Sequence, residues 1–218
     1  REEIRDLPVY VPGKPINAVK RALGLENVIK LASNENSWGP SPKVKDAINH
    51  CWQDLARYPE PSGYELRQAL AAKHHVPPDH FIFGNGSDEI VQMIASAFFK
   101  PGEEVLMGTP SFPRYPTVTQ FIGAIPIEVP LRDGYYPLED MAAQVSSRTK
   151  AIFICNPNNP SGTARSMVDI EKFVASIPSH ILLIFDEAYF EYMDEPVSGT
   201  RFLNSDRPVI VLRTFSKA

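Results

Sequence analysis

The sequence predicts an α/β protein, a three-layer α/β/α domain built around a mostly parallel sheet. Two observations carry this prediction. From about residue 81 onward, short apolar runs alternate with segments whose apolar residues recur at helical spacing, which is the pattern of strands joined by crossover helices. The apolar runs are also rich in Val, Ile and Phe at successive positions, as is typical of parallel strands that are buried on both faces.

Composition narrows the class of function. The hydrophobic content of 43% and the charged content of 22% are those of a globular protein. A formal net charge of −4 provides no basic excess for nucleic acid or an anionic membrane, and no apolar run approaches a membrane span of about 18 residues. The cysteines Cys51 and Cys155 form neither a CxxC pair nor a metal-spaced set. We therefore expect a small-molecule function without a metal, in a reducing cytoplasmic setting.

The first part of the chain is expected to be helical and separate from the sheet. Residues 1–40 would form an arm with one short helix near 17–23. A helix capped by Ser41, with an apolar face that packs on a core, is expected to end before the proline-rich stretch 57–63. A second amphipathic helix is expected over 64–74. We accordingly divide the chain into an arm and a domain that begins at Ser41 and continues to residue 218.

Strands and helices alternate in the rest of the chain. The expected strands are Phe81–Phe83, Glu104–Met107, Ile125–Val129, Ala151–Cys155, Ile181–Phe185 and Val209–Leu212. The expected helices are Glu89–Phe99, Tyr115–Ile122, Leu138–Val145 and Val168–Ile177. The stretch after Tyr192 is expected to be irregular.

Ligands bind open α/β sheets beyond the carboxyl ends of the strands, so the residues that follow each strand are the candidates for a site. After the first expected strand, the glycine turn Gly84–Glu89 leads into a helix and would present free backbone amides to an anion such as phosphate. The turn is not a dinucleotide fingerprint, because Glu89 stands where the third glycine is required. A tight turn capped by Ser87 is the alternative.

Two further strand ends carry suitable groups. Phe112 lies in a proline-stiffened turn, where it is suited to stack on a planar heterocycle, although a core aromatic is the commoner role. The loop 156–163 interleaves asparagines with prolines, so it is suited to hold an amide toward a ligand oxygen. The polar stretch 33–36 is suited either to ligand contact or to an Asx turn.

The last two strands end in a carboxylate and a lysine. Asp186 would be costly at the mouth of an apolar strand without a cation or a proton, and a pyridinium nitrogen would be such a cation. Metal ligation with Glu187 is less suitable, because adjacent strand residues point to opposite faces. Ser216 and Lys217 follow the final strand. A phosphate cradle, an amide, an aromatic ring, a carboxylate and a lysine are together what pyridoxal phosphate requires, with Lys217 holding it as a Schiff base.

These segments resemble the fold-type I pyridoxal-phosphate aminotransferases, and the histidinol-phosphate aminotransferase family in particular. Besides the lysine segment, the resemblance rests on Tyr10–Pro15, Leu31–Asn36, Gly84–Glu89, Asn158–Gly162 and Asp186–Tyr189. It covers essentially the whole chain. It implies amino transfer from histidinol phosphate to 2-oxoglutarate in histidine biosynthesis, by a cytoplasmic homodimer.

The resemblance also implies roles for individual residues. Lys217 would bond covalently to the cofactor, and Asp186 would keep its pyridine nitrogen protonated. Asn159 and Tyr189 would hydrogen-bond the 3′-oxygen, and Phe112 would stack on the ring. Lys217, Asp186 and Tyr189 are thus the expected catalytic residues.

The remaining roles concern the phosphate and the substrate. The phosphate would be bound by Gly86, Ser87, Asp88 and Ser216. Tyr58 would reach the phosphate of the neighbouring subunit's cofactor, which implies a homodimer. Tyr10 and Asn36 would contact the substrate, an amino donor or a 2-oxo acid.

Three alternatives stay open. The first is another enzyme on the same fold and cofactor, either an aromatic or other amino-acid aminotransferase or an amino-acid phosphate decarboxylase. The second is a non-catalytic truncated homologue. The third, a nucleotide-binding protein, is the least supported, because the glycine pattern fails at Glu89.

Members of the resembled family continue well beyond the lysine, with the rest of the large domain and a C-terminal small domain. The resemblance therefore implies that this fold-type I chain is truncated before the small domain, and that residues 1–40 belong in part to the small-domain and substrate region. We predict that the intact mass of the source protein exceeds 24.3 kDa. Mass spectrometry of the protein from its source checks this, and a match to 24.3 kDa would contradict it.

Overall fold

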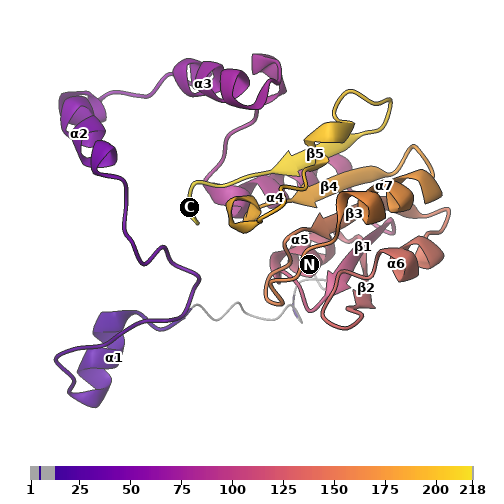
Figure 1. The fold of residues 1–218 in the computed structure, drawn as a ribbon, viewed down its shortest axis with the longest axis horizontal. Helices are drawn as coiled ribbons and strands as arrows, with labels where there is room; N and C mark the ends of the chain where they lie inside the picture. Colours follow the sequence, from indigo (N-terminus) through magenta and orange to yellow (C-terminus); the bar gives the residue numbers. More distant parts are fainter. Residues whose placement is uncertain (1–4, 6–12, 218) are drawn as a thin grey trace.

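The computed structural model describes residue 5 and residues 13–217, and its centre is a five-stranded parallel sheet (Figure 1). The strands lie in the order β2-β1-β3-β4-β5. Their bounds are β1 Glu104–Thr109, β2 Ile125–Pro130, β3 Thr149–Cys155, β4 Leu182–Asp186 and β5 Val209–Leu212. Every neighbouring pair is parallel. The predicted parallel sheet is confirmed.

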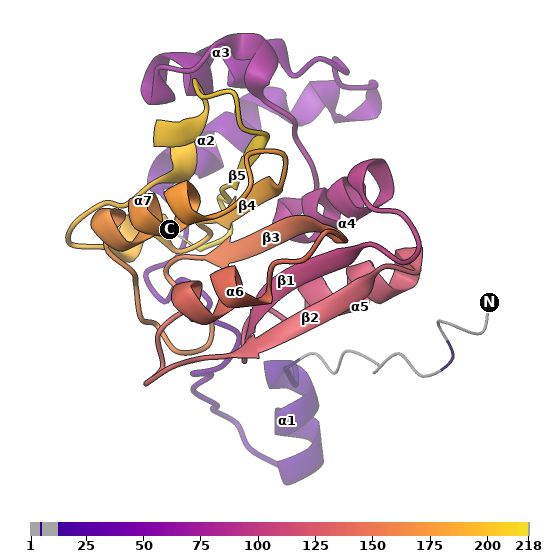
Figure 2. The same ribbon diagram turned by 90° about the vertical axis from the view of Figure 1, so that its right-hand side faces the viewer.

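Four helices cover the two faces of the sheet. They are α4 (Gly86–Phe98), α5 (Arg114–Ile122), α6 (Leu138–Gln144) and α7 (Met167–Ser176). Figure 2 shows α4 and α5 on one face and α6 and α7 on the other. The chain runs from β1 out to β2 and then back past β1 to β3, so right-handed connections require α5 and α6 to lie on opposite faces. The three-layer α/β/α fold is therefore confirmed.

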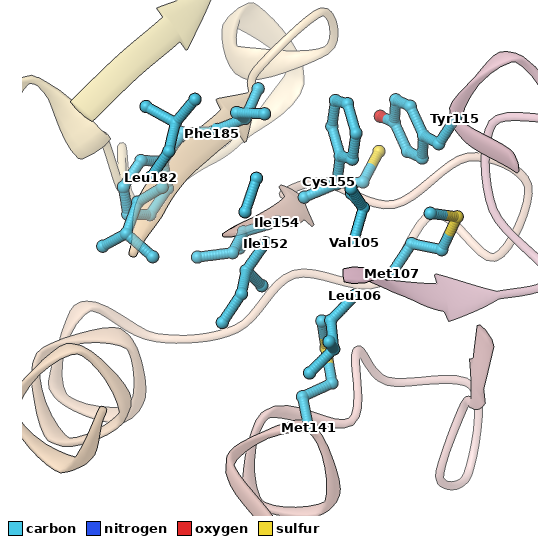
Figure 3. Packing of buried hydrophobic residues seen from close by; sticks show 14 of the residues in the cluster. Val105, Leu106, Met107, Tyr115, Met141, Ile152, Ile154, Cys155, Leu182 and Phe185 are labelled. Carbon is cyan, nitrogen blue, oxygen red and sulfur yellow. The ribbon is translucent and has the colours of Figure 1, made fainter. Parts of the chain in front are cut away.

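The hydrophobic core lies between the sheet and both helix layers. β1, β3 and β4 are buried along almost their whole lengths, whereas the edge strand β2 is mostly accessible. Figure 3 shows Tyr115 of α5 beside Cys155 and Met141 of α6 beside Leu106, on the two sides of the sheet. Burial on both faces explains why these strands are continuous apolar runs in the sequence.

The N-terminal helices form where the sequence predicts them but lie apart from the sheet. They are α1 (Ile16–Leu23), α2 (Pro42–Cys51) and α3 (Tyr64–His74), with a 3₁₀ turn η2 (Trp52–Ala56) after α2 (Figure 1). None has a buried residue among those described. The expected packing of the helix after Ser41 on a core is therefore not observed, and its Ile48, Trp52 and Leu55 are exposed. The predicted boundary between arm and domain stays a prediction.

The segment Phe81–Phe83 is not a strand, contrary to prediction. It is preceded by a 3₁₀ turn, η3 (Pro78–His80), and its backbone is held by a side chain instead. The Arg67 guanidinium donates to the carbonyls of Pro78, at 2.9 Å, and Phe81, and it lies 5.1 Å from the centre of the Phe83 ring. The apolar composition of residues 81–83 suits a strand, but no described strand lies beside the segment to complete a ladder.

The expected irregular stretch after Tyr192 contains only one short 3₁₀ turn, η5 (Gly199–Phe202), and η4 (Phe190–Tyr192) precedes it. Among residues 5 and 13–217, no helix is both long and apolar enough to cross a membrane.

The buried central strand and an exposed helix offer a matched test of the core. Val105 on β1 is fully buried, and Val168 on α7 is exposed. We predict that Val105→Ala lowers the free energy of unfolding by about 1.5–3 kcal/mol, because it removes buried methyl groups and leaves a cavity. Val168→Ala should leave stability unchanged or slightly raised, since alanine favours helix. Urea unfolding measures both, and equal losses would contradict this assignment of the core.

Candidate active site

A cavity of about 410 Å³ lies beyond the carboxyl ends of β1, β3, β4 and β5. β1 and β3 are neighbours, but their following segments lead to α5 and α7, which cover opposite faces of the sheet. Such a point, where the strand connections diverge, is where open α/β sheets bind ligands. The fold therefore places this cavity where a site is expected.

Most of the residues that the sequence predicts for the site line this cavity. They are Gly86, Ser87, Asp88, Phe112, Asn159, Asp186, Tyr189, Ser216 and Lys217. Tyr58 is exposed and does not line it. Asn36 does not line it either, because its side chain accepts from the Trp38 N–H at 3.0 Å in a local turn. Tyr10 lies outside the described residues.

Asp186 is a buried carboxylate with neutral partners. Its side chain accepts from the Tyr115 hydroxyl at 2.6 Å and from the Ala188 N–H at 3.1 Å. It forms no ion pair with any residue that the structure describes. Burial raises the pKa of Asp186, while the Tyr115 hydroxyl and the Ala188 N–H act in the opposite direction. The site therefore contains a negative charge that lacks a cation.

The next residue, Glu187, is a buried carboxylate that, unlike Asp186, pairs with a cation. It is equally buried, but Arg213 Nε lies 2.7 Å from its Oε2. Its other oxygen accepts the Gly199 N–H at 2.6 Å. Burial still raises the pKa of Glu187, with the Arg213 charge as the first opposing cause. Glu187 thus ties the end of β5 to the sheet, which leaves Asp186 as the carboxylate available to a ligand.

Of the asparagines after β3, only Asn159 faces the cavity. Asn156 is buried and exchanges hydrogen bonds with the Arg165 backbone. Asn158 is also buried and connects its loop to the loop after β1, since its side chain accepts from Ser111 at 2.8 Å and donates to the Pro110 carbonyl at 3.2 Å. The Asn159 side chain makes no hydrogen bond to another described residue. Its amide is therefore available to a ligand.

The amino end of α4 provides an anion-binding environment. Gly86 has a φ of 69°, a value that L side chains rarely adopt, and it turns the chain into the helix. The amides of Ser87 and Asp88 lie in the first turn, where N–H groups have no intrahelical acceptor. Arg114 Nε lies 2.6 Å from the Asp88 carboxylate. That ion pair reduces the repulsion that Asp88 would otherwise exert on an anion.

The arm reaches the cavity through Ser33 and Asn34. The Asn34 amide donates to the Tyr189 hydroxyl at 2.9 Å, and Lys217 Nζ lies 3.5 Å from the Ser33 carbonyl oxygen. Nζ is also 5.8 Å from the centre of the Tyr189 ring. Residues of the arm, of the segment after β4 and of the segment after β5 therefore meet around Lys217.

The sequence did not indicate six contributors: Tyr115, Ser33, Asn34, Thr214, Ala188 and Cys155. Tyr115 looks like any core aromatic of an amphipathic helix, and only its spacing of three from Phe112 places it on the same side. Ser33 and Asn34 belong to a stretch whose polar composition is suited to ligand contact, but the family resemblance indicates their neighbour Asn36. Thr214 shares a hydrogen bond with Ser216 at 2.9 Å, on the segment that leads to the lysine.

No group of three potential metal ligands is found within the described part of the chain.

A parallel sheet whose strand ends bring together a lysine, a carboxylate without a cation and an amide is the arrangement that the sequence predicts for a pyridoxal-phosphate site, and the chain belongs to the aminotransferase class I and II family. The model of that family matches residues 26–218. The predicted family resemblance is confirmed.

Several curated proteins to which the chain is similar are histidinol-phosphate aminotransferases. That of Caldicellulosiruptor saccharolyticus is 50% identical, and the match covers 100% of this chain and 61% of the relative. That of Brevibacillus brevis is 47% identical, with 100% and 60% covered. The chain thus spans about 60% of the length of these relatives.

Solved structures agree with this fold. The crystal structure of histidinol-phosphate aminotransferase from Sinorhizobium meliloti in complex with pyridoxal-5′-phosphate matches with a TM-score of 0.88 and 28% identity, and covers 99% of this chain and 58% of that one. An aromatic aminotransferase from Pyrococcus horikoshii matches with a TM-score of 0.76 and 26% identity, over 91% and 58%.

The unpaired charge of Asp186 predicts an unusual stability effect. A raised carboxyl pKa means that the folded protein binds this proton more tightly than the unfolded chain, so the wild type loses stability as pH rises from the ordinary value of 3.8 through the folded pKa. Asparagine has no such titration, and it can accept from Ala188 and donate to the Tyr115 oxygen. Without any ligand, Asp186→Asn should be more stable than wild type at neutral pH, and this advantage should vanish in acid.

Thermal unfolding of both proteins between about pH 4 and pH 8 measures this. The control is Glu187→Gln. The pKa of Glu187 is raised as well, but this change leaves the Arg213 guanidinium without its carboxylate, so it should destabilise the protein at neutral pH. An Asp186→Asn variant that is less stable than wild type across the whole range would contradict the reading of Asp186 as an unpaired charge.

Proposed function

We propose that this chain is the cofactor-binding part of a pyridoxal-phosphate-dependent aminotransferase that transfers the amino group of histidinol phosphate to 2-oxoglutarate, as a cytoplasmic step of histidine biosynthesis. The observation that carries the proposal is the buried Asp186 carboxylate, which faces the cavity without a cation. The names of the similar proteins support the choice of substrate.

The residues present fit the cofactor. Its ring nitrogen, when protonated, would be the cation that Asp186 lacks, and the Phe112 ring, which lines the cavity, suits a planar ring. Asn159 is free to donate to the 3′-oxygen. The phosphate suits the amino end of α4, where the Ser216 hydroxyl lines the same cavity. When bound, the cofactor supplies an electron sink for the carbon that loses a proton.

A hydrogen bond from the arm leaves the hydroxyl hydrogen of Tyr189 available to a ligand. Because the Asn34 amide already donates to the Tyr189 oxygen, the hydroxyl hydrogen is left for another acceptor. That acceptor would be the 3′-oxygen of the cofactor. Tyr189 and Asn159 would then hold this oxygen from two sides of the cavity.

Lys217 would hold the cofactor covalently through Nζ and would then act on the substrate. If a substrate amine displaced Nζ from the cofactor, Nζ would be free to act as a base, and it could remove the proton from the substrate Cα and return it one position away. The Ser33 carbonyl is suited to orient Nζ, since it lies 3.5 Å from it. Asp186 would stay ionised and would hold the proton on the ring nitrogen while this proton moves.

We also propose a homodimer in which Tyr58 reaches the cavity of the partner. Tyr58 is fully exposed and lies outside the cavity of its own chain. The nearby apolar residues Ile48, Trp52 and Leu55 are exposed on α2 and η2, and an apolar face of this kind favours burial against another surface. Tyr10 and Asn36 stay proposed as substrate contacts.

The second candidate is an aromatic aminotransferase. Its specific support is the structural match to the Pyrococcus horikoshii enzyme. The cavity groups described above suit the cofactor, so they would serve either activity equally well. Only the amino donor distinguishes the two proposals.

We predict that Lys217→Ala, made in the intact source protein, abolishes the visible absorption that wild type acquires with pyridoxal phosphate, because the covalent attachment is lost. The control is Lys172→Ala, which removes an exposed lysine on α7 and should leave the absorption unchanged. Persistence of the band in Lys217→Ala would contradict the role of this lysine.

Steady-state assays with 2-oxoglutarate and three donors then separate the candidates. Histidinol phosphate should give the highest kcat/KM, whereas a higher value for phenylalanine would favour the aromatic aminotransferase. Release of carbon dioxide from threonine phosphate would instead favour a decarboxylase.

A further inference from the structure

We infer that Tyr115 is a positioning residue that keeps the Asp186 carboxylate ionised and directed into the cavity, and that it thereby determines how firmly the ring nitrogen of the cofactor holds its proton. This inference rests on the proposed function, since it concerns the ligand that Asp186 faces. Tyr115 itself touches neither the cofactor nor the substrate in this account. It acts through Asp186.

The hydrogen bond between the two residues is short and buried. Tyr115 Oη lies 2.6 Å from Asp186 Oδ2, which is the usual length of a hydrogen bond from a hydroxyl to an ionised carboxylate. Tyr115 has no accessible surface, and Asp186 is only 3% exposed. Water therefore does not compete for this contact, and the loss of the hydroxyl would not be compensated by solvent.

The Tyr115 ring is fixed by its neighbours. It stacks on Phe153 with a centroid distance of 4.3 Å and an angle of 12° between the rings. Phe112 meets it edge-on at 5.5 Å and 80°. The aromatic contacts hold the hydroxyl in place whether or not the carboxylate is charged. They also connect Tyr115 to Phe112, the residue that is suited to stack on the cofactor.

In the hydrogen bond between Tyr115 and Asp186, the Tyr115 hydroxyl is the donor and the carboxylate is the acceptor. Burial, and next the negative charge of Asp186, raise the pKa of Tyr115 well above its ordinary value. The phenol therefore stays protonated and is the donor of the hydrogen bond. The same hydroxyl lowers the pKa of Asp186 against the effect of burial. The Ala188 N–H is the second donor, on the other carboxylate oxygen.

A carboxylate and a ring nitrogen that face each other compete for one proton. Donors to the carboxylate lower its basicity, so the proton stays on the nitrogen. Without the Tyr115 hydroxyl, Asp186 becomes the stronger base and the nitrogen becomes neutral more often. Through Asp186, Tyr115 would thus influence the charge on the ring nitrogen of the cofactor.

Other titratable groups surround Asp186 and belong in any account of its pH dependence. The Cys155 thiol on β3 is close, but burial, and next the Asp186 charge, raise its pKa to about 12, so it stays neutral. The titratable groups that line the rest of the cavity are Asp88, Tyr189 and Lys217. None of these replaces the hydrogen bond that Tyr115 donates.

The test is Tyr115→Phe in the intact protein, which keeps the ring stack and removes the hydroxyl. The matched control is Tyr136→Phe. Tyr136 is also an almost fully buried tyrosine, but its hydroxyl does not bond to Asp186, since it accepts from the Gly108 N–H and donates to the Phe153 carbonyl, both at 2.9 Å. A loss that comes merely from deleting a buried hydroxyl should therefore appear in both variants.

Three readouts are needed. The ¹⁵N chemical shift of ring-labelled pyridoxal phosphate reports protonation of its nitrogen. The dissociation constants of pyridoxal phosphate and of the analogue with carbon in place of the ring nitrogen separate effects that pass through this atom. The ¹³C titration of the Asp186 carboxyl without cofactor reports on the hydrogen bond alone.

We expect Tyr115→Phe to shift the ¹⁵N signal toward neutral pyridine and to weaken pyridoxal phosphate binding roughly tenfold or more, because a hydrogen bond to a charged group is lost. Binding of the carbon analogue should not weaken, and the Asp186 carboxyl should titrate at higher pH. Tyr136→Phe should change none of these readouts.

Other outcomes would overturn the inference. An unchanged Asp186 titration in Tyr115→Phe would do so whether or not a cofactor binds. Equal weakening of both ligands would show that Tyr115 only supports the fold. If wild type fails to bind pyridoxal phosphate at all, the proposed function fails, and the inference about the ring nitrogen fails with it.

Discussion

The arrangement of this chain depends on one buried charge, the Asp186 carboxylate at the end of β4. Removing a carboxylate from water is costly, and here the only compensation from the described residues is two neutral donors, Tyr115 and the Ala188 backbone. The neighbouring Glu187 has Arg213 to balance its charge. A buried charge without a counter-charge reduces the stability of the fold unless a ligand provides that counter-charge. The position of Asp186 is therefore typical of a binding site.

The sheet explains why the other groups lie around this charge. Parallel strands end at the same edge, and the chain diverges to opposite faces after β1 and β3, which opens a cavity between them. Asn158 spans the two loops with hydrogen bonds to Ser111 and Pro110. Phe112 and Asn159, which directly follow these joined residues, line the cavity. The arm also lines it, through Ser33 and Asn34, and Asn34 donates to the Tyr189 hydroxyl.

The sequence was a good guide wherever structure is decided locally or by burial. Apolar runs and helical spacing predicted the five strands and the helices between them, because strands buried on both faces must be apolar throughout. The segment 81–83 has the same composition, but a strand also requires a neighbour, which composition does not reveal. The residue types at strand ends likewise predicted the cavity lining. Tyr115 escaped notice, since its contact with Asp186 joins positions 71 residues apart.

A crystal structure of the intact source protein with pyridoxal phosphate would show whether Asp186 pairs with the cofactor. We expect the ring nitrogen to lie within hydrogen-bond distance of the Asp186 carboxylate, the phosphate to lie at the amino end of α4, and Lys217 Nζ to be bonded to the cofactor. A cofactor bound elsewhere, or a ring nitrogen that faces another group while Asp186 stays unpaired, would contradict this expectation.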